Sequence, residues 1–240
     1  MIDTTRLRAV FFDADDTLYS VRESVGTQYH PHFKAHDVHV TIEEIDTVVP
    51  LAWQALTASY ENREDNHITT HERDESIWRE YVQNVLSHFS DKPVTESLYQ
   101  SIYHEFAKPE SRVLSPYVTE LLHHLREKGY ITGVLTNNDK RVHTLIEGLG
   151  LAHHFDFVFC ASDLGYKKPA KEVFHRLAEK ANCTASELLY IGDCPHNDIQ
   201  GAFNAGCQAL WYNINDTHSY DLHRNTPSVQ CFRFAKQLFS

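Results

Sequence analysis

The second half of the chain alternates helical and strand-like segments, and this alternation constrains the fold more than any other feature of the sequence. Short apolar runs at residues 131–135, 157–160, 188–191 and 209–212 are separated by segments with helical periodicity. Strands separated by helices predict a parallel sheet that is covered by helices on both faces. The apolar run at residues 9–12 has the same character, so we expect it to be a further strand of that sheet.

Helices are expected to connect these strands at residues 116–128, 140–149, 171–181 and 198–205. Gly129 follows the first of them directly and is a typical helix stop. A polar stretch at residues 213–227 is expected to be a loop. A last strand at 229–232 and a last helix at 234–239 are expected to follow it.

A region with a different pattern, residues 20–111, separates the first strand from the alternating region. It is almost devoid of strand-like alternation, and helices are expected at residues 23–36, 41–61, 71–89 and 94–107. The sequence from Thr41 to Glu44 is a good helix start, whereas Pro50 is expected to kink or divide that helix. Residues 62–70 are polar and are expected to form a loop.

The predicted fold class is therefore α/β, with a Rossmann-like parallel-sheet core and an inserted all-helical domain. The core is assigned to residues 1–19 and 112–240, and the inserted domain to residues 20–111. Clefts between two domains are favoured ligand sites.

Composition excludes several classes of partner. The 240 residues carry a formal net charge of −11, and the lysines and arginines are scattered, so neither nucleic acid nor an anionic membrane is an expected partner. The five cysteines are scattered without a Cys-x-x-Cys pair, and five cannot all pair within the chain, which suits a reducing cytoplasm better than secretion. No apolar run is long enough to cross a bilayer, so we expect a soluble, cytoplasmic protein.

The 17 histidines include pairs at helical spacing, His32 with His36 and His67 with His71. Neither a cysteine nor a carboxylate completes a familiar zinc pattern beside these pairs in the sequence. We therefore interpret them as solvated helix surfaces.

Three carboxylates, Asp13, Asp15 and Asp16, follow the first strand within four positions. Carboxylates this close repel one another, so their burial requires a cation, a proton or hydrogen-bond donors. Mg²⁺ is the simplest such cation because it prefers oxygen ligands. Taken alone, the stretch is equally compatible with an acidic surface turn.

Polar residues also follow the other strands of the predicted sheet, where ligands bind in open parallel sheets. They are Thr136 and Asn137 after one strand, Lys168 after a second, and Asp193 and Asp198 after a third. Each has an ordinary alternative as a helix cap, a turn residue or a solvated cation. Their occurrence together at converging strand ends favours a functional site.

These residues resemble, in order, the four motifs of the haloacid dehalogenase-like (HAD) hydrolase superfamily. Residues 13–17 match its Asp-x-Asp-x-Thr motif, residues 136–137 its second motif, residues 168–169 its Lys-Pro motif, and residues 192–198 its Gly-Asp-x-x-x-x-Asp motif. The helical insertion corresponds to the first type of cap in that superfamily. Within it, the chain is most similar to the rhythmically expressed gene 2-like branch (hydrolase domain-containing protein 3), and a pyrimidine nucleotidase branch is also similar.

The resemblance implies a role for each acidic residue. Asp13 is implied to be the nucleophile that forms an aspartyl-phosphate, and Asp15 the general acid and base. Mg²⁺ is implied as cofactor, held by the Asp13 side chain, the Asp15 backbone carbonyl and Asp193. Asp198 would bind it through water or position Lys168.

The remaining motif residues are implied to support the same chemistry. Thr136 would donate to a phosphate oxygen, and Lys168 would offset the charge of nucleophile and phosphate. Thr17 would orient Asp15, and Asn137 would shape the site.

Asp16 departs from the family pattern, because many relatives have glycine there. Cys194 and His196 are interpreted as loop residues.

The expected function is that of a Mg²⁺-dependent phosphatase of a small phosphate monoester. True haloacid dehalogenases lack the second aspartate, so Asp15 favours phosphoryl chemistry. Two alternatives remain, a phosphotransferase such as a sugar-phosphate mutase and a catalytically weak binding protein. The expected partner is a small phosphorylated metabolite, and a monomer is the default. The sequence leaves the substrate open.

Overall fold

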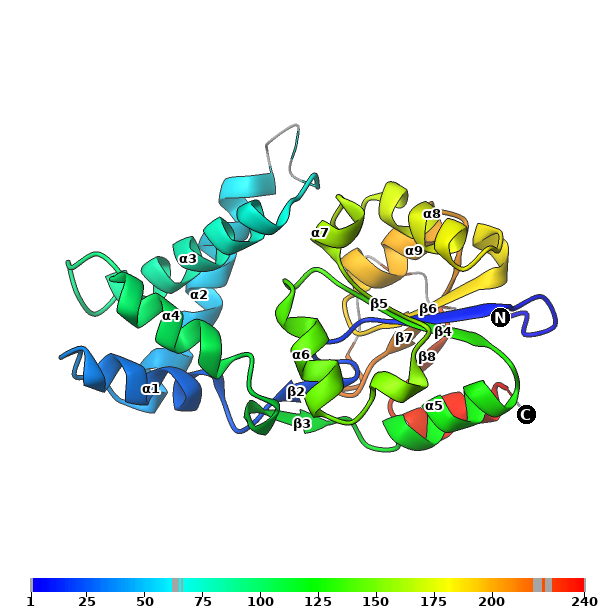
Figure 1. The fold of residues 1–240 in the computed structure, drawn as a ribbon, viewed down its shortest axis with the longest axis horizontal. Coiled ribbons are helices and arrows are strands. Elements are labelled where there is room, and N and C mark those ends of the chain that lie inside the picture. Colours follow the sequence, from blue (N-terminus) through cyan, green and yellow to red (C-terminus); the bar gives the residue numbers. More distant parts are fainter. Residues whose placement is uncertain (1, 62–64, 66, 218–221, 223–225, 240) are drawn as a thin grey trace.

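The computed structural model describes residues 2–61, 65, 67–217, 222 and 226–239, and its larger part is built on a six-stranded sheet (Figure 1). Its strand order is β5-β4-β1-β6-β7-β8, and every pair of neighbours is parallel. The strands are β1 (Ala9–Phe12), β4 (Ile131–Thr136), β5 (Phe157–Cys160), β6 (Leu188–Gly192), β7 (Gln208–Tyr212) and β8 (Ser228–Val229). The predicted α/β fold class is confirmed.

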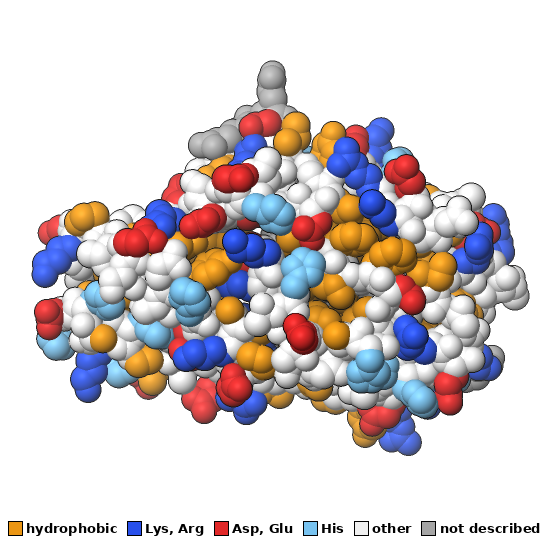
Figure 2. Space-filling model, in the orientation of Figure 1, with side chains coloured by type: hydrophobic (Ala, Val, Ile, Leu, Met, Phe, Trp, Pro, Cys, Tyr) orange, Lys and Arg blue, Asp and Glu red, His pale blue; other side chains and the backbone are white. Residues whose placement is uncertain are grey.

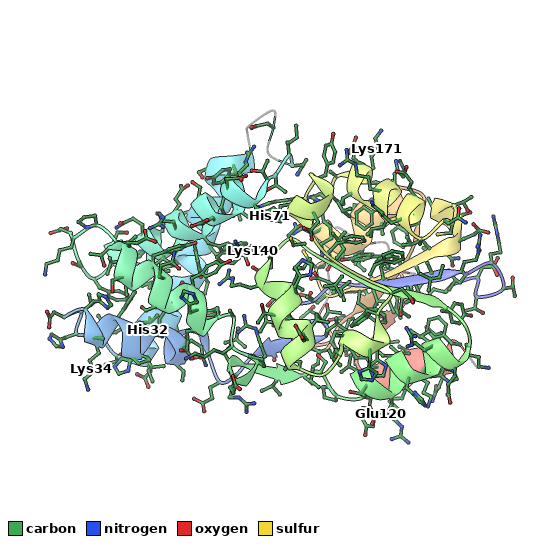
Figure 3. The ribbon with its side chains drawn as sticks, in the orientation of Figure 1. His32, Lys34, His71, Glu120, Lys140 and Lys171 are labelled. Carbon is green, nitrogen blue, oxygen red and sulfur yellow. The ribbon has the colours of Figure 1, made fainter. Side chains whose placement is uncertain are left out.

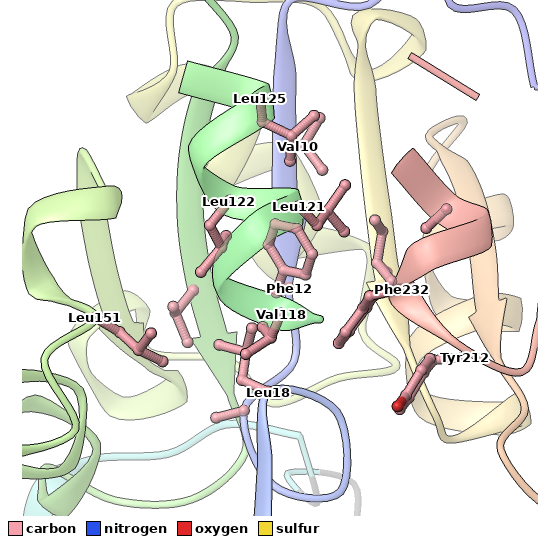
Figure 4. Close-up of a cluster of buried hydrophobic side chains, with 14 of the residues drawn as sticks. Val10, Phe12, Leu18, Val118, Leu121, Leu122, Leu125, Leu151, Tyr212 and Phe232 are labelled. Carbon is pink, nitrogen blue, oxygen red and sulfur yellow. The ribbon is translucent and has the colours of Figure 1, made fainter. Parts of the chain in front are cut away.

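Strand β1 lies in the middle of the sheet and is buried on both faces. Val10 and Phe12 point into one core cluster, which the helices on that face complete (Figure 4). Ala9 and Phe11 point into the cluster on the opposite face. All four side chains are fully buried, which explains why this strand is a continuous apolar run instead of an alternating one.

Helices cover both faces of the sheet, as predicted. They are α5 (Val118–Glu127), α6 (Arg141–Gly148), α7 (Ala161–Leu164), α8 (Lys171–Lys180), α9 (Gly201–Asn204) and α10 (Phe232–Gln237). Short helical turns occur at η1 (Pro109–Ser111), η2 (Ala152–His154), η3 (Ala185–Glu187) and η4 (Pro195–Gln200). Helix α7 was not expected, and Phe232 begins α10 instead of ending a strand.

A second body consists of the helices α1 (Val25–Ala35), α2 (Ile42–Glu61), α3 (His71–Ser87) and α4 (Glu96–Glu105) (Figure 1). The predicted start of α2 is confirmed, because Thr41 N–H donates to Glu44 Oε2 at 2.8 Å and Glu44 N–H donates to Thr41 Oγ1 at 3.2 Å. Pro50 does not divide α2. Pro50 lies on the exposed side of α2. Because proline has no N–H, one backbone carbonyl in the preceding turn lacks its helical hydrogen bond, and water can reach that carbonyl on this side.

A two-stranded antiparallel ribbon connects the two bodies. It pairs β2 (Tyr19–Val21) with β3 (Arg112–Leu114), so the chain enters and leaves the helical body side by side. The ribbon was not predicted, because each strand has only three residues and its partner is far away in the sequence. The domain limits at residues 19 and 112 fall within it and stay a prediction.

The helical body also contacts the sheet body at a second place. Thr69 N–H donates to Gly165 O at 3.1 Å, and Lys167 N–H donates to His67 O at 2.7 Å. The predicted loops 62–70 and 213–227 lie partly outside the described residues. Within the described ranges, no helix combines the length and the apolar character needed to span a membrane.

Candidate active site

The predicted site residues come together at the carboxyl edge of the sheet. Asp13 directly follows β1, and its backbone N–H donates to Ile191 O of β6 at 2.8 Å. Thr136 is the last residue of β4, and Asp193 directly follows β6. Lys168 reaches the same place from the loop between α7 and α8.

Lys168 is the electrostatic centre of the site. Its Nζ lies 2.7 Å from Asp13 Oδ1 and 2.7 Å from Asp198 Oδ1. It also donates to Tyr190 OH at 2.8 Å, a residue that sequence reasoning missed. Burial disfavours the ammonium, but the charges of Asp13 and Asp198 outweigh this and raise the pKa of Lys168 well above its usual value. The lysine is therefore a fixed positive charge beside Asp13.

Asn137 holds the backbone of Lys168. Its Nδ2 donates to Lys168 O at 2.9 Å, and its Oδ1 accepts from Lys168 N–H at 2.8 Å. Thr136 Oγ1 accepts from Asn138 N–H at 3.0 Å, which leaves the hydroxyl hydrogen to donate to a ligand. Asn137 thus fixes the lysine, and Thr136 supplies a donor.

Asp15 is oriented by two residues that the motif analysis did not name. Asn138 Nδ2 donates to Asp15 Oδ2 at 2.9 Å, and Arg112 Nε lies 3.9 Å from Asp15 Oδ1. Asn138 could have been found from the sequence, because it follows Thr136 and Asn137 directly. Arg112 could not, since the ribbon that brings it to Asp15 was not predicted.

Thr17 differs from the expected arrangement, and the expectation that it orients Asp15 is corrected. Its hydroxyl donates to Asp193 Oδ1 at 3.0 Å, while Trp211 Nε1 donates to Asp193 O at 2.8 Å. Thr17 therefore positions the carboxylate of Asp193.

Two backbone features explain residue choices around the site. Asp16 has a φ of 57°, a left-handed conformation that favours glycine and that aspartate tolerates better than most residues. Gly192 packs against Asp198, since a Cβ there would lie 2.3 Å from Asp198 Oδ2. A side chain at residue 192 would displace the acid that holds Lys168.

Asp13, Asp193 and Asp198 have oxygen atoms within 4.8 Å of one another, which suits a divalent cation. Burial raises the pKa of Asp13 well above its usual range, and the charges of Asp198 and Asp193 add to this while Lys168 opposes it. Burial, together with the charges of Asp198 and Asp16, raises the pKa of Asp193 to about 7. A cation would relieve this repulsion, so these residues fit Mg²⁺. The carboxylate of Asp15 is not in this group, and its expected role as a ligand through the backbone carbonyl stays a prediction.

A second group of potential ligand atoms consists of His71, Cys160 and Asp163. His71 begins α3 of the helical body and is labelled in Figure 3, whereas Cys160 and Asp163 belong to β5 and α7 of the sheet body. Asp163 Oδ2 already accepts from Cys160 N–H at 2.9 Å as part of the capping box of α7. His71 Nε2 lies 3.4 Å from Asp163 Oδ1. His71 is thus an inter-body contact and not the purely solvated histidine that we expected.

A cavity of about 310 Å³ opens above the carboxylates and extends into the helical body. Asp13, Asp15 and Lys168 line one end of it, and aromatic side chains of α1–α4 line the other. The outer surface in the view of Figure 2 mixes acidic, basic and histidine side chains. The charges in the cavity are less mixed than those on this surface, because its carboxylates all lie at the end that the sheet body lines.

A parallel sheet with acids and a buried lysine at its carboxyl edge, below an inserted helical body, defines a class of capped α/β hydrolases. The model for the family "haloacid dehalogenase-like hydrolase" matches residues 7–206, and the chain belongs to this family. The chain is 27% identical over 213 residues to haloacid dehalogenase-like hydrolase domain-containing protein 3 of Bos taurus, covering 88% of this chain and 83% of the relative. It is 29% identical over 219 residues to a glyceraldehyde 3-phosphate phosphatase of Methanothermobacter thermautotrophicus, covering 89% and 88%.

Solved structures agree with the fold. The magnesium-bound HAD-hydrolase YfnB of Bacillus subtilis superimposes with a TM-score of 0.77 at 20% identity, covering 98% of this chain and 99% of the other. A 2-haloacid dehalogenase of Pseudomonas syringae gives a TM-score of 0.66 at 24% identity, covering 97% of each chain. A HAD phosphatase of Thermococcus onnurineus shares this fold as well, with a TM-score of 0.68 at 18% identity, covering 98% of each chain, so the chemistry has to be argued from the site.

Proposed function

We propose that this hydrolase is a Mg²⁺-dependent phosphatase that acts on a small phosphate monoester through an aspartyl-phosphate at Asp13. The observation that carries the proposal is the position of Lys168 Nζ, 2.7 Å from both Asp13 and Asp198. A buried ammonium beside a candidate nucleophile attracts a dianionic phosphate and offsets the charge that gathers during transfer.

The proposed reaction has two steps. Asp13 attacks phosphorus, the bond to the alcohol oxygen breaks, and the alcohol leaves with a proton from Asp15. Asp15, now a carboxylate, takes a proton from water, which attacks phosphorus and releases phosphate from Asp13. The hydrogen bond from Asn138 to Asp15 Oδ2 at 2.9 Å holds this acid in place for both steps.

The other residues bind and orient. Thr136 donates to a phosphate oxygen, and Asn137 keeps Lys168 in position through the two hydrogen bonds to its backbone. Asp13, Asp193 and the backbone carbonyl of Asp15 would hold Mg²⁺, and Thr17 would orient Asp193. Asp198 would bind the ion through water or position Lys168. When bound, Mg²⁺ supplies positive charge that neutralises the phosphate and the carboxylates.

Asp15 favours phosphoryl transfer over dehalogenation. A departing alkoxide needs a proton, whereas a departing halide needs none, so a second acid next to the nucleophile is useful only in the first reaction. The glyceraldehyde 3-phosphate phosphatase among the relatives supports the same choice.

The setting that we propose is a reducing cytoplasm, which fits five cysteines that are all free. A small phosphorylated metabolite is the proposed partner, and a monomer the proposed state. The proposed domain limits are 1–19 and 112–240 for the core and 20–111 for the cap.

The test is phosphate release from a panel of monoesters, with and without Mg²⁺, for the wild type and Asp13→Asn. We expect Mg²⁺-dependent release that Asp13→Asn lowers at least about 1000-fold, because the nucleophile is lost. Asp91→Asn, at an exposed position of the helical body, is the matched control and should retain activity. Full activity of Asp13→Asn would refute the mechanism, and faster transfer to a sugar phosphate than to water would make the protein a phosphotransferase.

A further inference from the structure

The cavity over Asp13 connects the reacting groups with an aromatic chamber in the helical body. Both ends belong to one space of about 310 Å³, near the lower end of the volumes that hold a drug-sized ligand. A phosphate bound at Asp13 and Lys168 would therefore direct its alcohol group into the chamber. The side chains that line the chamber should therefore indicate which kind of alcohol group binds there.

The walls of the chamber are flat rings, among them Tyr29, Trp53, Trp78, Tyr81, Tyr103 and Phe106. Trp53 and Trp78 stack with centroids 5.8 Å apart at an interplanar angle of 27°. Tyr81 packs edge-on against both, at 5.4 and 5.8 Å. Trp53 is 45% exposed, so these rings are not simply an interior core. Rings braced in this way present a preformed surface for another ring.

The described cations around the chamber are all paired with carboxylates, with one exception among their buried donors, a single N–H that has no hydrogen-bond partner. Arg141 Nε lies 2.8 Å from Asp139 Oδ1, and the guanidinium lies over the rings of Trp78 and Tyr103 at 4.9 and 4.4 Å. Lys168 is held by Asp13 and Asp198. A second phosphate or a carboxylate on the alcohol would thus find little free positive charge among the described lining residues.

The exception is Arg112. Its Nη1 donates to Ser111 Oγ at 2.7 Å and its Nη2 to Phe106 O at 3.0 Å, while its buried Nε has no hydrogen-bond partner. This Nε lies 3.9 Å from Asp15 Oδ1, beside the acid proposed to protonate the leaving oxygen. A buried, unpartnered donor needs an acceptor. The missing acceptor would sit on the substrate, close to its ester oxygen.

We infer that the substrate is a phosphate monoester whose alcohol carries a flat, mostly apolar ring and a hydrogen-bond acceptor near the ester oxygen. The ring binds against Trp53 and Trp78, and the acceptor receives the Nε–H of Arg112. This inference rests on the proposed phosphatase function. The ring is attached either through a single carbon or through a sugar.

The test compares kcat/KM for esters with and without the ring. Uridine 5′-monophosphate is matched with ribose 5-phosphate, and benzyl phosphate with methyl phosphate, because the two alcohols of this second pair have nearly the same acidity. We expect the ring-bearing ester of at least one pair to be preferred about tenfold or more, in line with the contribution of one ring stacked on an aromatic side chain. The pair with the larger preference tells how the ring is attached.

Trp78→Ala should reduce that preference about tenfold. The ratio of two substrates within one variant does not depend on how much of the protein is folded. Trp78→Phe, which keeps a ring, should retain most of the preference. Phe234→Ala removes an exposed ring from α10, away from the cavity, and should leave the preference unchanged.

The outcomes separate this inference from the proposed function. Equal or better hydrolysis of ribose 5-phosphate and methyl phosphate would overturn the inference and leave the phosphatase function intact. An unchanged preference in Trp78→Ala would also overturn it. Absence of Mg²⁺-dependent release from all esters, including those without a ring, would overturn both.

Discussion

At the scale of single residues, the site depends on neighbours that fix its charged groups. The proposed mechanism requires Asp15 to give and take a proton at one position, and Asn138 Nδ2 donates to Asp15 Oδ2 at 2.9 Å. The asparagine is itself tied to Thr136 through its backbone N–H. Asn138 is therefore a positioning residue for the proposed acid.

We predict that Asn138→Ala lowers kcat about 10- to 100-fold and changes KM little, because a misplaced acid weakens the step in which the alcohol leaves. Substrates with good leaving groups, such as nitrophenyl phosphate, should lose less than alkyl esters. Steady-state kinetics with both ester types measure this. Asn204→Ala, exposed on α9, is the control, and an equal loss for both ester types would contradict the role of Asn138.

The raised pKa of Asp193 predicts how pH affects the metal-free protein. With its pKa raised to about 7, folded Asp193 holds a proton that the unfolded chain releases near pH 4. The free energy of unfolding without metal should therefore fall as the pH rises from about 4 to about 7. Mg²⁺ needs the carboxylate, so the rise in Tm that it causes should grow over the same range.

Thermal unfolding at several pH values, with Mg²⁺ or with EDTA, checks this prediction. Asp193→Asn has no carboxylate to titrate and should show a much smaller response to Mg²⁺. A Mg²⁺-induced rise in Tm that is larger at pH 5 than at pH 7 would show that the sign is wrong.

The sequence predicted which side chains meet at the strand ends better than how each one is held. The positions of Asp13, Thr136 and Asp193 follow from parallel strands, which bring their carboxyl ends to one edge. The partner of Thr17 depends on the path of a turn, and periodicity does not encode this path. The contact of Tyr190 with Lys168 was not predicted for a different reason. In the sequence, a tyrosine within an apolar strand looks like an ordinary core residue.

At the scale of elements, the helical body is attached to the sheet body on both sides of the site. One attachment is the β2–β3 ribbon, and the other is the contact of residues 67–69 with residues 165–167. In the second, Lys167 Nζ lies 2.9 Å from Asp74 Oδ1, and Asp74 is fully buried. Lys167 therefore holds α3 close to the loop that carries Lys168.

We predict that Lys167→Ala lowers the free energy of unfolding by about 1–3 kcal/mol, because it leaves the buried Asp74 without its cation. It should also raise KM, since α3 carries Trp78 of the cavity wall. Denaturant titration and steady-state kinetics check both effects. Lys171→Ala, an exposed lysine of α8, is the control, and unchanged stability of Lys167→Ala would contradict the proposed attachment.

Elements were predictable to the extent that they are long or strongly patterned. The helices of the insertion and the strands of the sheet have clear periodicities, and their positions are confirmed within a few residues. The ribbon strands and α7 have three or four residues each, too few to show a period. Tertiary contacts create them, and a local pattern cannot reveal such contacts.

At the scale of the whole molecule, the two bodies divide the task. The sheet body supplies Asp13, Asp15 and Lys168, and the helical body supplies the aromatic part of the cavity. Arg141 connects them, because it starts α6 of the sheet body and lies over rings of the helical body. In the proposed function, chemistry and substrate choice are therefore carried by separate bodies that share one cavity.

The most direct test of the account is to trap the phosphoryl group on the enzyme. The wild type is mixed with Mg²⁺ and its best ester, quenched within one turnover, reduced with borohydride and mapped by mass spectrometry. An acyl phosphate is reduced by borohydride, so we predict that the peptide containing Asp13 carries homoserine at that position. Homoserine should be absent without substrate and in Asp13→Asn. Phosphate release without modification of Asp13, or modification at another residue, would contradict the account.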